Sequence, residues 1–303
     1  MHPLPAVTPL EDGSWLLPYR PPYHWPGILA FFRTRAIPGL ELVGEATYSR
    51  VIEVESSVGS VEIADAPEHA GLQIRLAFEN TKAQAEIFRR LRRMFDLDRD
   101  PGAVAEVLAQ DPRLAPMVAA RPGLRVPGAW DGLEIAIRAI LGQQVTVRAA
   151  TVLASRMVAT LGQTIPPEIS RTGLTHTFPK PDRLTTEAVA ALGMPRARAA
   201  AIAGVAAAAQ ANPGLFAPGY PELTTAIETL RGLPGIGDWT AHYIAMRVLR
   251  EADAFPAGDV ALQRILAVDG VRPTAKVLLT HAERWRPWRA YAVLHVWMSE
   301  ALQ

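Results

Sequence analysis

A five-residue run, Leu233-Pro234-Gly235-Ile236-Gly237, constrains this chain most, because it joins two helical patterns through two glycines. Apolar residues recur at helical spacing on both sides of it, at Leu223, Ile227 and Leu230 before the run and at Trp239, Tyr243 and Met246 after it. Glycines adopt backbone angles closed to other residues, so the run predicts a tight turn between helices, with Asp238 as the N-cap of the second helix. Free N–H groups at that helix start favour a phosphate-binding turn, and an ordinary helix–helix corner is the alternative.

The amino-acid composition limits the classes of protein in which such a turn can lie. The chain has 303 residues, 49% of them apolar, which is enough for two or three globular domains. It has no cysteine, which excludes disulfides, thiolate zinc sites and cysteine-ligated iron–sulfur clusters. The net charge of +1 provides no general basic surface, so any DNA binding must come from a local one. No apolar run is long enough to span a membrane and residues 1–15 lack a secretory pattern, so a cytoplasmic protein is expected.

Strand signals are confined to the first hundred residues. Alternating runs near 48–54, 61–63 and 72–76 predict strands, a short helix is expected near 28–35, and Asn80 or Thr81 is expected to cap a helix through Phe95. After residue 100 the patterns are helical, over 102–110, 131–160, 185–192, 195–211, 222–231, 238–250, 259–267, 274–283 and 287–301. The predicted fold is therefore α+β, a small antiparallel sheet with helices followed by a mainly helical remainder.

Two of these helices carry specific expectations. The longest runs over 131–160, and Asp131 is expected to cap its N-terminus. The stretch 197–209 is rich in alanine, the residue with the highest intrinsic helix propensity, and is interpreted as a plain scaffold helix.

A second turn-forming loop, Phe255-Pro256-Ala257-Gly258-Asp259, ends on an acid where another helical run begins. Asp259 is either an ordinary N-cap or a carboxylate held rigidly at a cleft. The seven histidines are scattered without metal-ligand spacing, so His242 and His295 are interpreted as packing or surface residues. A Walker loop, a G-x-G-x-x-G run after a strand and a G-x-S-x-G elbow are all missing from the sequence.

At this point the sequence resembles the helix-hairpin-helix DNA glycosylases, whose signature is a Leu-Pro-Gly-Ile-Gly hairpin followed by an aspartate after a Pro-x-x segment. Within that superfamily it is similar to the AlkA-type DNA-3-methyladenine glycosylases II. The runs that carry the likeness are Pro22-Tyr23-His24-Trp25, Arg138-Ala139-Ile140-Leu141-Gly142-Gln143-Gln144-Val145, Gly237-Asp238-Trp239-Thr240-Ala241 and Arg284-Trp285-Arg286-Pro287-Trp288-Arg289 to Trp297. The resemblance implies an N-terminal α+β domain over 1–107 and a glycosylase core of two helical subdomains. One subdomain covers 132–251 with the hairpin, and the other covers 108–131 and 252–303.

The resemblance also implies an activity and a set of roles. The expected protein is a monofunctional DNA glycosylase of base excision repair, which flips an alkylated base such as 3-methyladenine out of duplex DNA and hydrolyses its N-glycosidic bond. Asp259 matches the catalytic aspartate, which stabilises the positive sugar that forms as the base departs and helps to orient the attacking water. Asp238, the competing acid, is assigned the capping role. The implied pocket rings are Phe31, Trp239, Tyr243 and Trp297, and they attract a base made cationic by alkylation; filling a core is their alternative role.

The implied DNA contacts are the hairpin residues Leu233, Pro234, Gly235, Ile236 and Gly237, together with Gln144. At the Gln144 position the family can carry an apolar side chain that fills the gap left by the flipped base, and glutamine departs from that pattern. Met298 occupies a position where the family can carry a second aromatic residue. No cofactor is expected for the chemistry. The resemblance implies a structural Na⁺ or K⁺ at the hairpin, held by the backbone carbonyls of Arg231, Leu233 and Ile236.

The β-lyase members of the superfamily carry a lysine two residues after the last hairpin glycine, and that position is Trp239 here, so no strand cleavage is expected. The expected partner is double-stranded DNA containing alkylated bases, with no membrane, and the chain is expected to be a monomer. Two alternatives stay open: a non-catalytic damage-binding protein with the same hairpin, and a glycosylase for other damaged bases.

Overall fold

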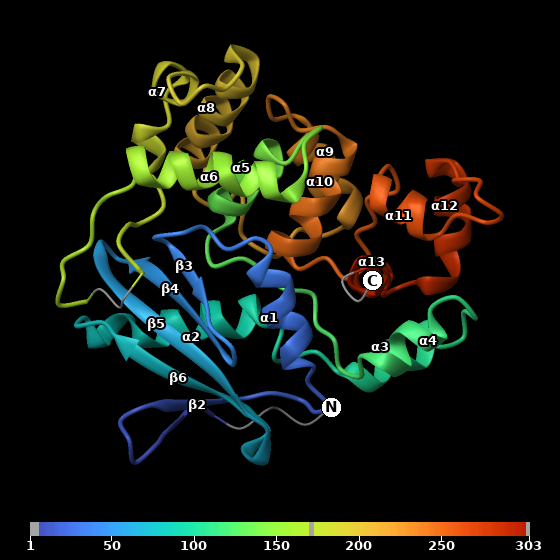
Figure 1. Cartoon of the computed structure of the whole chain (residues 1–303), viewed down its shortest axis with the longest axis horizontal. Helices are drawn as coiled ribbons and strands as arrows, with labels where there is room; N and C mark the ends of the chain where they lie inside the picture. Colours follow the sequence, from blue (N-terminus) through green and yellow to red (C-terminus); the bar gives the residue numbers. More distant parts are fainter. Residues whose placement is uncertain (1–5, 170–172, 301–303) are drawn as a thin grey trace.

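The computed structural model describes residues 6–169 and 173–300, and places an antiparallel sheet beside a larger helical body (Figure 1). The strands are β1 (Thr8–Pro9), β2 (Trp15–Pro18), β3 (Glu41–Val43), β4 (Thr47–Val54), β5 (Ser57–Ala66) and β6 (Gly71–Ala77). Their order in space is β1-β2-β6-β5-β4-β3, and every neighbouring pair is antiparallel. Strands β4, β5 and β6 confirm the prediction, whereas β1, β2 and β3 were missed.

A tight turn sets the register of the central β4–β5 hairpin. Val54 pairs with Ser57, and the two residues between them, Glu55 and Ser56, have φ values of 50° and 66°. Positive φ at both central positions is the conformation whose twist matches the two flanking strands.

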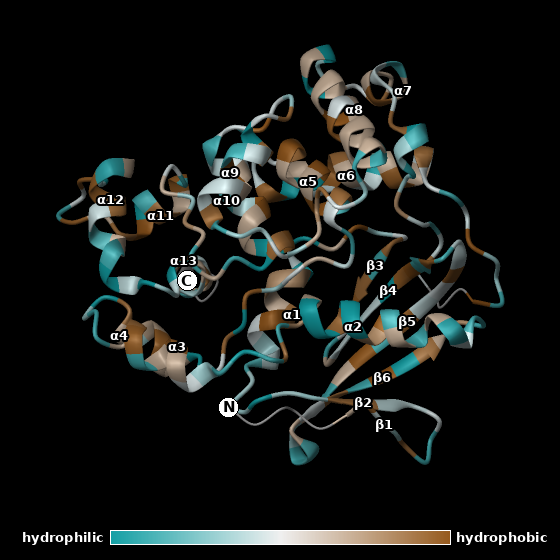
Figure 2. Cartoon of the chain, turned by 180° about the vertical axis from the view of Figure 1, so that it is seen from behind, coloured by the Kyte–Doolittle hydropathy of each residue, from teal (hydrophilic) through white to brown (hydrophobic). Residues whose placement is uncertain are grey.

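Helices cover the sheet and connect it to the rest of the molecule. Helix α2 (Gln84–Met94) lies across one face of the sheet (Figure 2). It follows the 3₁₀ turn η2 (Thr81–Ala83), where the Asn80 side chain accepts a hydrogen bond from the Lys82 N–H, so Asn80 rather than Thr81 is the cap. Helix α1 (Trp25–Arg33) packs through Phe32, whose ring centroid lies 4.6 Å from that of Tyr48 in β4 and 5.9 Å from that of Phe95.

The other helices and helical turns are connected by loops. This helical part includes every remaining named element of the described chain. Its elements are η1 (Pro67–His69), α3 (Pro101–Leu108), α4 (Ala115–Ala120), α5 (Gly132–Leu141), α6 (Val147–Leu161), η3 (Pro181–Arg183), α7 (Thr186–Ala190), α8 (Arg196–Ala211), α9 (Leu223–Arg231), α10 (Asp238–Ile244), the π-helical turn η4 (Ala245–Leu249), α11 (Val260–Ile265), α12 (Ala275–Ala282), η5 (Glu283–Trp285) and α13 (Arg289–Glu300). In the view of Figure 1, helices α5 to α10 gather above the sheet, α11 to α13 lie to the right of α9 and α10, and α3 and α4 lie at the lower right.

The predicted single helix over 131–160 is wrong. Asp131 does cap α5, accepting a hydrogen bond from the Glu134 N–H at 2.9 Å, but the helix ends at Leu141. A new helix, α6, starts after Thr146, whose hydroxyl accepts from the Ala149 N–H at 3.2 Å. Between them Gln144 adopts a left-handed φ of 59°, which is uncommon for a residue other than glycine and ends the helical path.

Candidate active site

Asp259 stands at the N-terminus of α11, at the end of the loop that the sequence singled out. Its side-chain oxygen Oδ1 accepts a hydrogen bond from the Leu262 N–H at 2.9 Å, which is the geometry of an N-cap. Only 8% of the residue is exposed. Asp259 is therefore an N-cap, as one of the two sequence interpretations predicts, and its carboxylate is also nearly inaccessible to water.

Two indole rings hold the same carboxylate from other helices. The Nε1–H of Trp239 donates to Oδ2 of Asp259 at 2.8 Å, and the Nε1–H of Trp297 donates to Oδ1 at 3.1 Å. Trp239 belongs to α10 and Trp297 to α13, so three elements converge on one carboxylate. N–H donors on both oxygens fix the position of the carboxylate, which is what a charge-stabilising group in a catalytic site requires.

The aromatic side chains around Asp259 form a connected group. Trp239 and Tyr243 lie one turn apart on α10 and stack with ring centroids 5.2 Å apart and planes 16° from parallel. Tyr243 in turn lies 6.2 Å from Trp297, at an interplanar angle of 42°. The structure thus brings together three of the four predicted pocket rings with the predicted aspartate.

Phe31, the fourth ring, connects to this group through an arginine. Phe31 lies on α1 and is 2% exposed, and the guanidinium carbon of Arg247 stands 4.8 Å from its ring centroid. Nη1 of Arg247 donates to the Tyr243 hydroxyl at 2.8 Å. Burial alone would raise the pKa of Tyr243, but the charges of Arg247 and Arg35 and this hydrogen bond lower it below its ordinary value. Sequence reasoning missed Arg247, although it lies four residues after Tyr243.

The hairpin over 233–237 packs closely on α8. Gly235 has a φ of 74°, and a Cβ on it would stand 2.5 Å from the Cβ of Ala201, so only glycine fits. A Cβ on Gly204 would stand 3.0 Å from Cγ of Pro234. The alanine-rich helix therefore supports the hairpin as a scaffold because its side chains are small.

Asp238 does not cap α10, contrary to the prediction. The N-cap is Gly237, which has no side chain to bond the exposed N–H groups, and Asp238 is the first residue of the helix. Its carboxylate still lies in the first turn, where a negative charge is favourable to the helix dipole.

The break between α5 and α6 is tied to the hairpin by Gln143, a residue that sequence reasoning quoted but gave no role. Its amide Nε2 donates to the Gly235 carbonyl at 2.8 Å and to the Thr240 hydroxyl at 3.0 Å. Nη2 of Arg198 on α8 donates to the Gln143 carbonyl at 2.9 Å. Gln144, the predicted DNA contact, is exposed at the tip of this braced segment.

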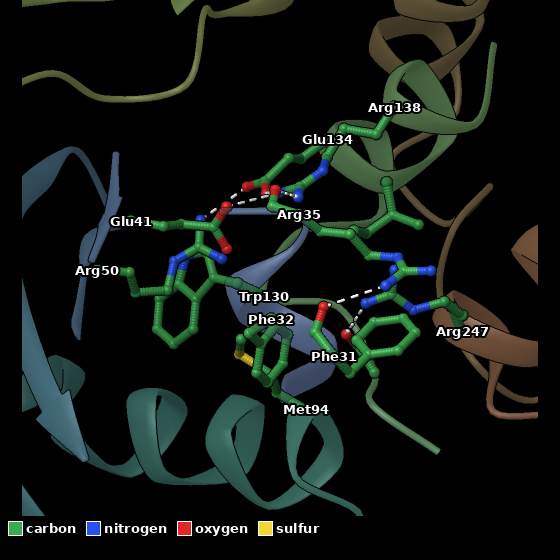
Figure 3. A pocket seen from close by; sticks show the side chains of 12 residues that line it. Phe31, Phe32, Arg35, Glu41, Arg50, Met94, Trp130, Glu134, Arg138 and Arg247 are labelled. Atoms are coloured by element: carbon green, nitrogen blue, oxygen red, sulfur yellow. Dashed lines mark hydrogen bonds and ion pairs between the residues drawn. The ribbon is translucent and has the colours of Figure 1, made fainter. Parts of the chain in front are cut away.

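A buried ion network lies on the sheet side of Phe31 (Figure 3). Arg50 of β4 pairs with Glu134 of α5 at 2.7 Å, and Arg138 of α5 pairs with Glu41 of β3 at 2.8 Å and with Glu134 at 3.0 Å. Nη2 of Arg138 also donates to the Arg35 carbonyl. The network joins the sheet to α5 and fixes the backbone that carries Arg35.

In the described part of the chain, no group of three or more histidine or acidic residues is arranged to hold a metal ion. Nδ1 of His242 accepts a hydrogen bond from the Phe255 N–H at 3.2 Å. His295 is 3% exposed, and burial lowers its pKa to about 4. None of the described helices is long and apolar enough to cross a membrane.

Comparisons with known proteins agree with this architecture. The family model described as the AlkA N-terminal domain matches residues 14–131. A protein of Escherichia coli strain K12 named DNA-3-methyladenine glycosylase 2 is 36% identical over 296 residues, covering 95% of this chain and 98% of that protein. The chain is also 37% identical over 295 residues to Mycobacterium tuberculosis proteins named probable bifunctional transcriptional activator/DNA repair enzyme AlkA, but it spans 58% of their length.

Among solved structures, the 3-methyladenine DNA glycosylase from Archaeoglobus fulgidus superimposes with a TM-score of 0.81 at 21% identity, covering 95% of this chain and 98% of that one. The chain therefore has the fold of the helix-hairpin-helix DNA glycosylases, with the hairpin close to a buried aspartate. Within that class, the chain belongs to the AlkA family of DNA-3-methyladenine glycosylases.

Proposed function

We propose that this protein is a monofunctional DNA glycosylase of base excision repair, acting in the cytoplasm on double-stranded DNA that contains alkylated bases. The observation that carries the proposal is the Asp259 carboxylate, held by two indole N–H groups and one backbone N–H among stacked aromatic rings. A protein that only bound damage would have no use for so constrained a charge. The names of the E. coli and M. tuberculosis relatives point the same way.

The proposed reaction starts with the damaged base leaving the helical stack and entering the pocket of Trp239, Tyr243 and Trp297, with Phe31 behind. Unstacking costs a few kcal/mol, and less for a damaged base. The C1′–N bond then breaks, its electron pair leaves with the base, and the sugar becomes positively charged. The Asp259 carboxylate stabilises that charge, and a water oxygen adds to C1′ as its proton is released.

In this proposal the hairpin holds the DNA backbone beside the lesion. The backbone N–H groups of Gly235 and Gly237 contact phosphate without reading sequence, and Gln144 fills the gap left by the flipped base through hydrogen bonds. The carbonyls of Arg231, Leu233 and Ile236 would hold Na⁺ or K⁺, which supplies positive charge near a phosphate. The Leu233 carbonyl accepts the Ile236 N–H at 3.2 Å, and its second lone pair suits an alkali cation.

The test is release of methylated purines from alkylated duplex DNA, with Asp259→Asn assayed beside the wild type. We expect release by the wild type alone. If the wild type binds alkylated DNA but releases no methylated purine, the protein is a damage-binding protein. If it releases oxidised bases or uracil in place of methylated purines, it is a glycosylase of another specificity. Strand nicking without added base or heat would contradict the monofunctional assignment, which rests on Trp239 at the lysine position.

A further inference from the structure

A tight turn between α11 and α12 leaves apolar side chains in water. Val268 and Val271 pair through two backbone hydrogen bonds of 3.1 and 2.8 Å, and Asp269 and Gly270 between them have φ values of 50° and 77°. Val268 is 49% exposed and Val271 is 71% exposed. Because these two side chains bury little area in the fold itself, the valine turn, residues 268–271, is a candidate contact surface.

The exposed apolar surface continues onto the two helices that the valine turn connects (Figure 1). Leu262 of α11 and Leu278 of α12 are buried, whereas Val260 is 60% exposed and Val277 is 56% exposed. Val260 directly follows Asp259, so this surface begins at the edge of the candidate active site. Exposed apolar side chains gathered along one segment are typical of an interaction site.

The same segment carries positive charge that no acid neutralises. Arg272 and Lys276 are exposed, and among the described residues no carboxylate lies within ion-pair distance of either side chain. The exposed Arg89 on α2, by contrast, is paired with Glu86 at 2.6 Å. Residues 260–282 hold three basic residues and one acid, a net charge of +2, although the whole chain carries only +1. The positive charge of the protein therefore collects locally, and this segment is one of the places.

Chain geometry keeps the valine turn close to Asp259. Helix α11 has six residues, which span about 9 Å, and the three residues that follow add about 11 Å at most. Val268 therefore lies within about 20 Å of Asp259, whose own position is fixed on α10 by the hydrogen bond from Trp239. Nucleotides of one DNA strand are about 3.4 Å apart along the axis, so a duplex bound at Asp259 covers that distance in about six base pairs.

We propose that the valine turn and the start of α12 form a second DNA-contact surface, in which Arg272 and Lys276 bind backbone phosphates and Val271 packs on the sugars between them. This inference rests on the proposed glycosylase function and extends the surface on which the duplex lies beyond the hairpin. Phosphates supply the negative charge that the two cations lack, and deoxyribose offers apolar atoms to the valines. Contacts of this kind read no base sequence, which suits an enzyme that acts on damage anywhere.

The valine turn also contains the one acid of this segment, which gives the proposal a test of opposite sign. Asp269 is exposed, and its carboxylate repels a phosphate bound nearby. Asparagine followed by glycine is a preferred pair where both central residues of a turn have positive φ, so Asp269→Asn keeps the turn and removes the charge. The surface therefore predicts tighter DNA binding for Asp269→Asn and weaker binding for Arg272→Gln.

The experiment is fluorescence anisotropy of an undamaged duplex of about 20 base pairs, at NaCl concentrations between about 50 and 200 mM. Each phosphate contact contributes about 0.9 to the slope of log affinity against log salt, so Arg272→Gln and Lys276→Gln should each flatten the slope by about that amount. Over this range the affinity of the wild type should fall about threefold more than that of either variant. Val271→Ser should bind about three- to tenfold more weakly with an unchanged slope, because it removes apolar contact and no charge.

Lys82→Gln is the matched control, because it removes another exposed lysine, from the turn before α2, and lowers the net charge by the same amount. It should keep the wild-type slope. Wild-type slopes in both Arg272→Gln and Lys276→Gln would overturn the surface. A Val271→Ser protein with unchanged DNA affinity and reduced self-association in sedimentation would also overturn it, since the valines would then pack on a second copy of the chain.

The contact surface and the glycosylase function fail in distinguishable ways. A wild type that binds duplex DNA and releases no methylated purine contradicts the function, and the salt slopes still decide whether the surface contacts DNA. A wild type that releases methylated purines while both variants keep its slope contradicts the surface alone.

Discussion

Asp259 combines two demands in one residue, since the same side chain starts α11 and accepts two indole N–H groups. The sequence predicts the acid, because it follows a Pro-x-x loop at the start of a helical run. It cannot predict the two donors, because Trp239 lies 20 residues before it and Trp297 lies 38 residues after it. Contacts at that separation are set by helix packing and not by local pattern.

Two substitutions separate the negative charge of Asp259 from its role as the N-cap of α11. Asp259→Asn removes the charge and keeps a good N-cap, so we expect base release to fall about 10²- to 10³-fold with little change in stability. Asp259→Ala removes both, and should lose a further ~1 kcal/mol of unfolding free energy. Release assays and urea denaturation check the pair. Equal stability losses in both variants would show that asparagine does not cap α11.

His295 makes the fold sensitive to acid. Burial lowers its pKa from 6.5 in the unfolded chain to about 4 in the native protein. Between pH 6.5 and pH 4, the imidazole is therefore protonated in the unfolded chain and neutral in the native protein. Its contribution is absent above pH 6.5, and as the pH falls to 4 it destabilises the native state by about 3 kcal/mol. Urea unfolding at several pH values should show a shallower loss for His295→Gln. His69→Gln, at an exposed site, should keep the wild-type slope, and identical slopes in all three proteins would refute the effect.

At the scale of elements, the break between α5 and α6 shows where local pattern misleads. Apolar residues continue at helical spacing across the break. Gly142 is the one residue there whose helix propensity is low enough to indicate the end of a helix. The break is stabilised by Gln143, which bonds Gly235 92 residues away. Most helices and the central strands were predictable because their apolar faces repeat. The missed strands β1, β2 and β3 are too short to establish a repeat.

Gln143 should keep the hairpin and the Gln144 segment in one fixed arrangement. We expect Gln143→Ala to weaken binding to lesion-containing duplex DNA about tenfold, because the loss of hydrogen bonds at Gly235 and Thr240 is worth 1–2 kcal/mol. The maximal rate at saturating enzyme should change much less. Fluorescence anisotropy and single-turnover kinetics measure the two quantities. Gln110→Ala, at an exposed helix end, is the matched control, and unchanged affinity in Gln143→Ala would rule out the bracing role.

At the scale of the whole molecule, a buried ion network joins the sheet to the helical body. Glu134→Gln leaves Arg50 and Arg138 without that carboxylate in a buried site, and we expect a loss of about 3–5 kcal/mol of unfolding free energy. Asp12→Asn, which breaks an exposed pair with Arg75, should change the free energy of unfolding far less, because water and salt screen the charges of an exposed pair. Urea denaturation compares the two. A similar small loss in both variants would mean that water reaches the network.

The path that builds the pocket spans almost the entire chain. It runs from Phe31 on α1 through Arg247, Tyr243 and Trp239 to Asp259, and closes at Trp297 on α13. Chains are synthesised from the N-terminus, so the sheet and α1 exist long before their catalytic partners leave the ribosome. A nascent chain that contains only the sheet and α1 therefore holds no complete site. Under the proposed function, the site is complete only when α13 brings Trp297 to Asp259, so base removal has to await the end of synthesis.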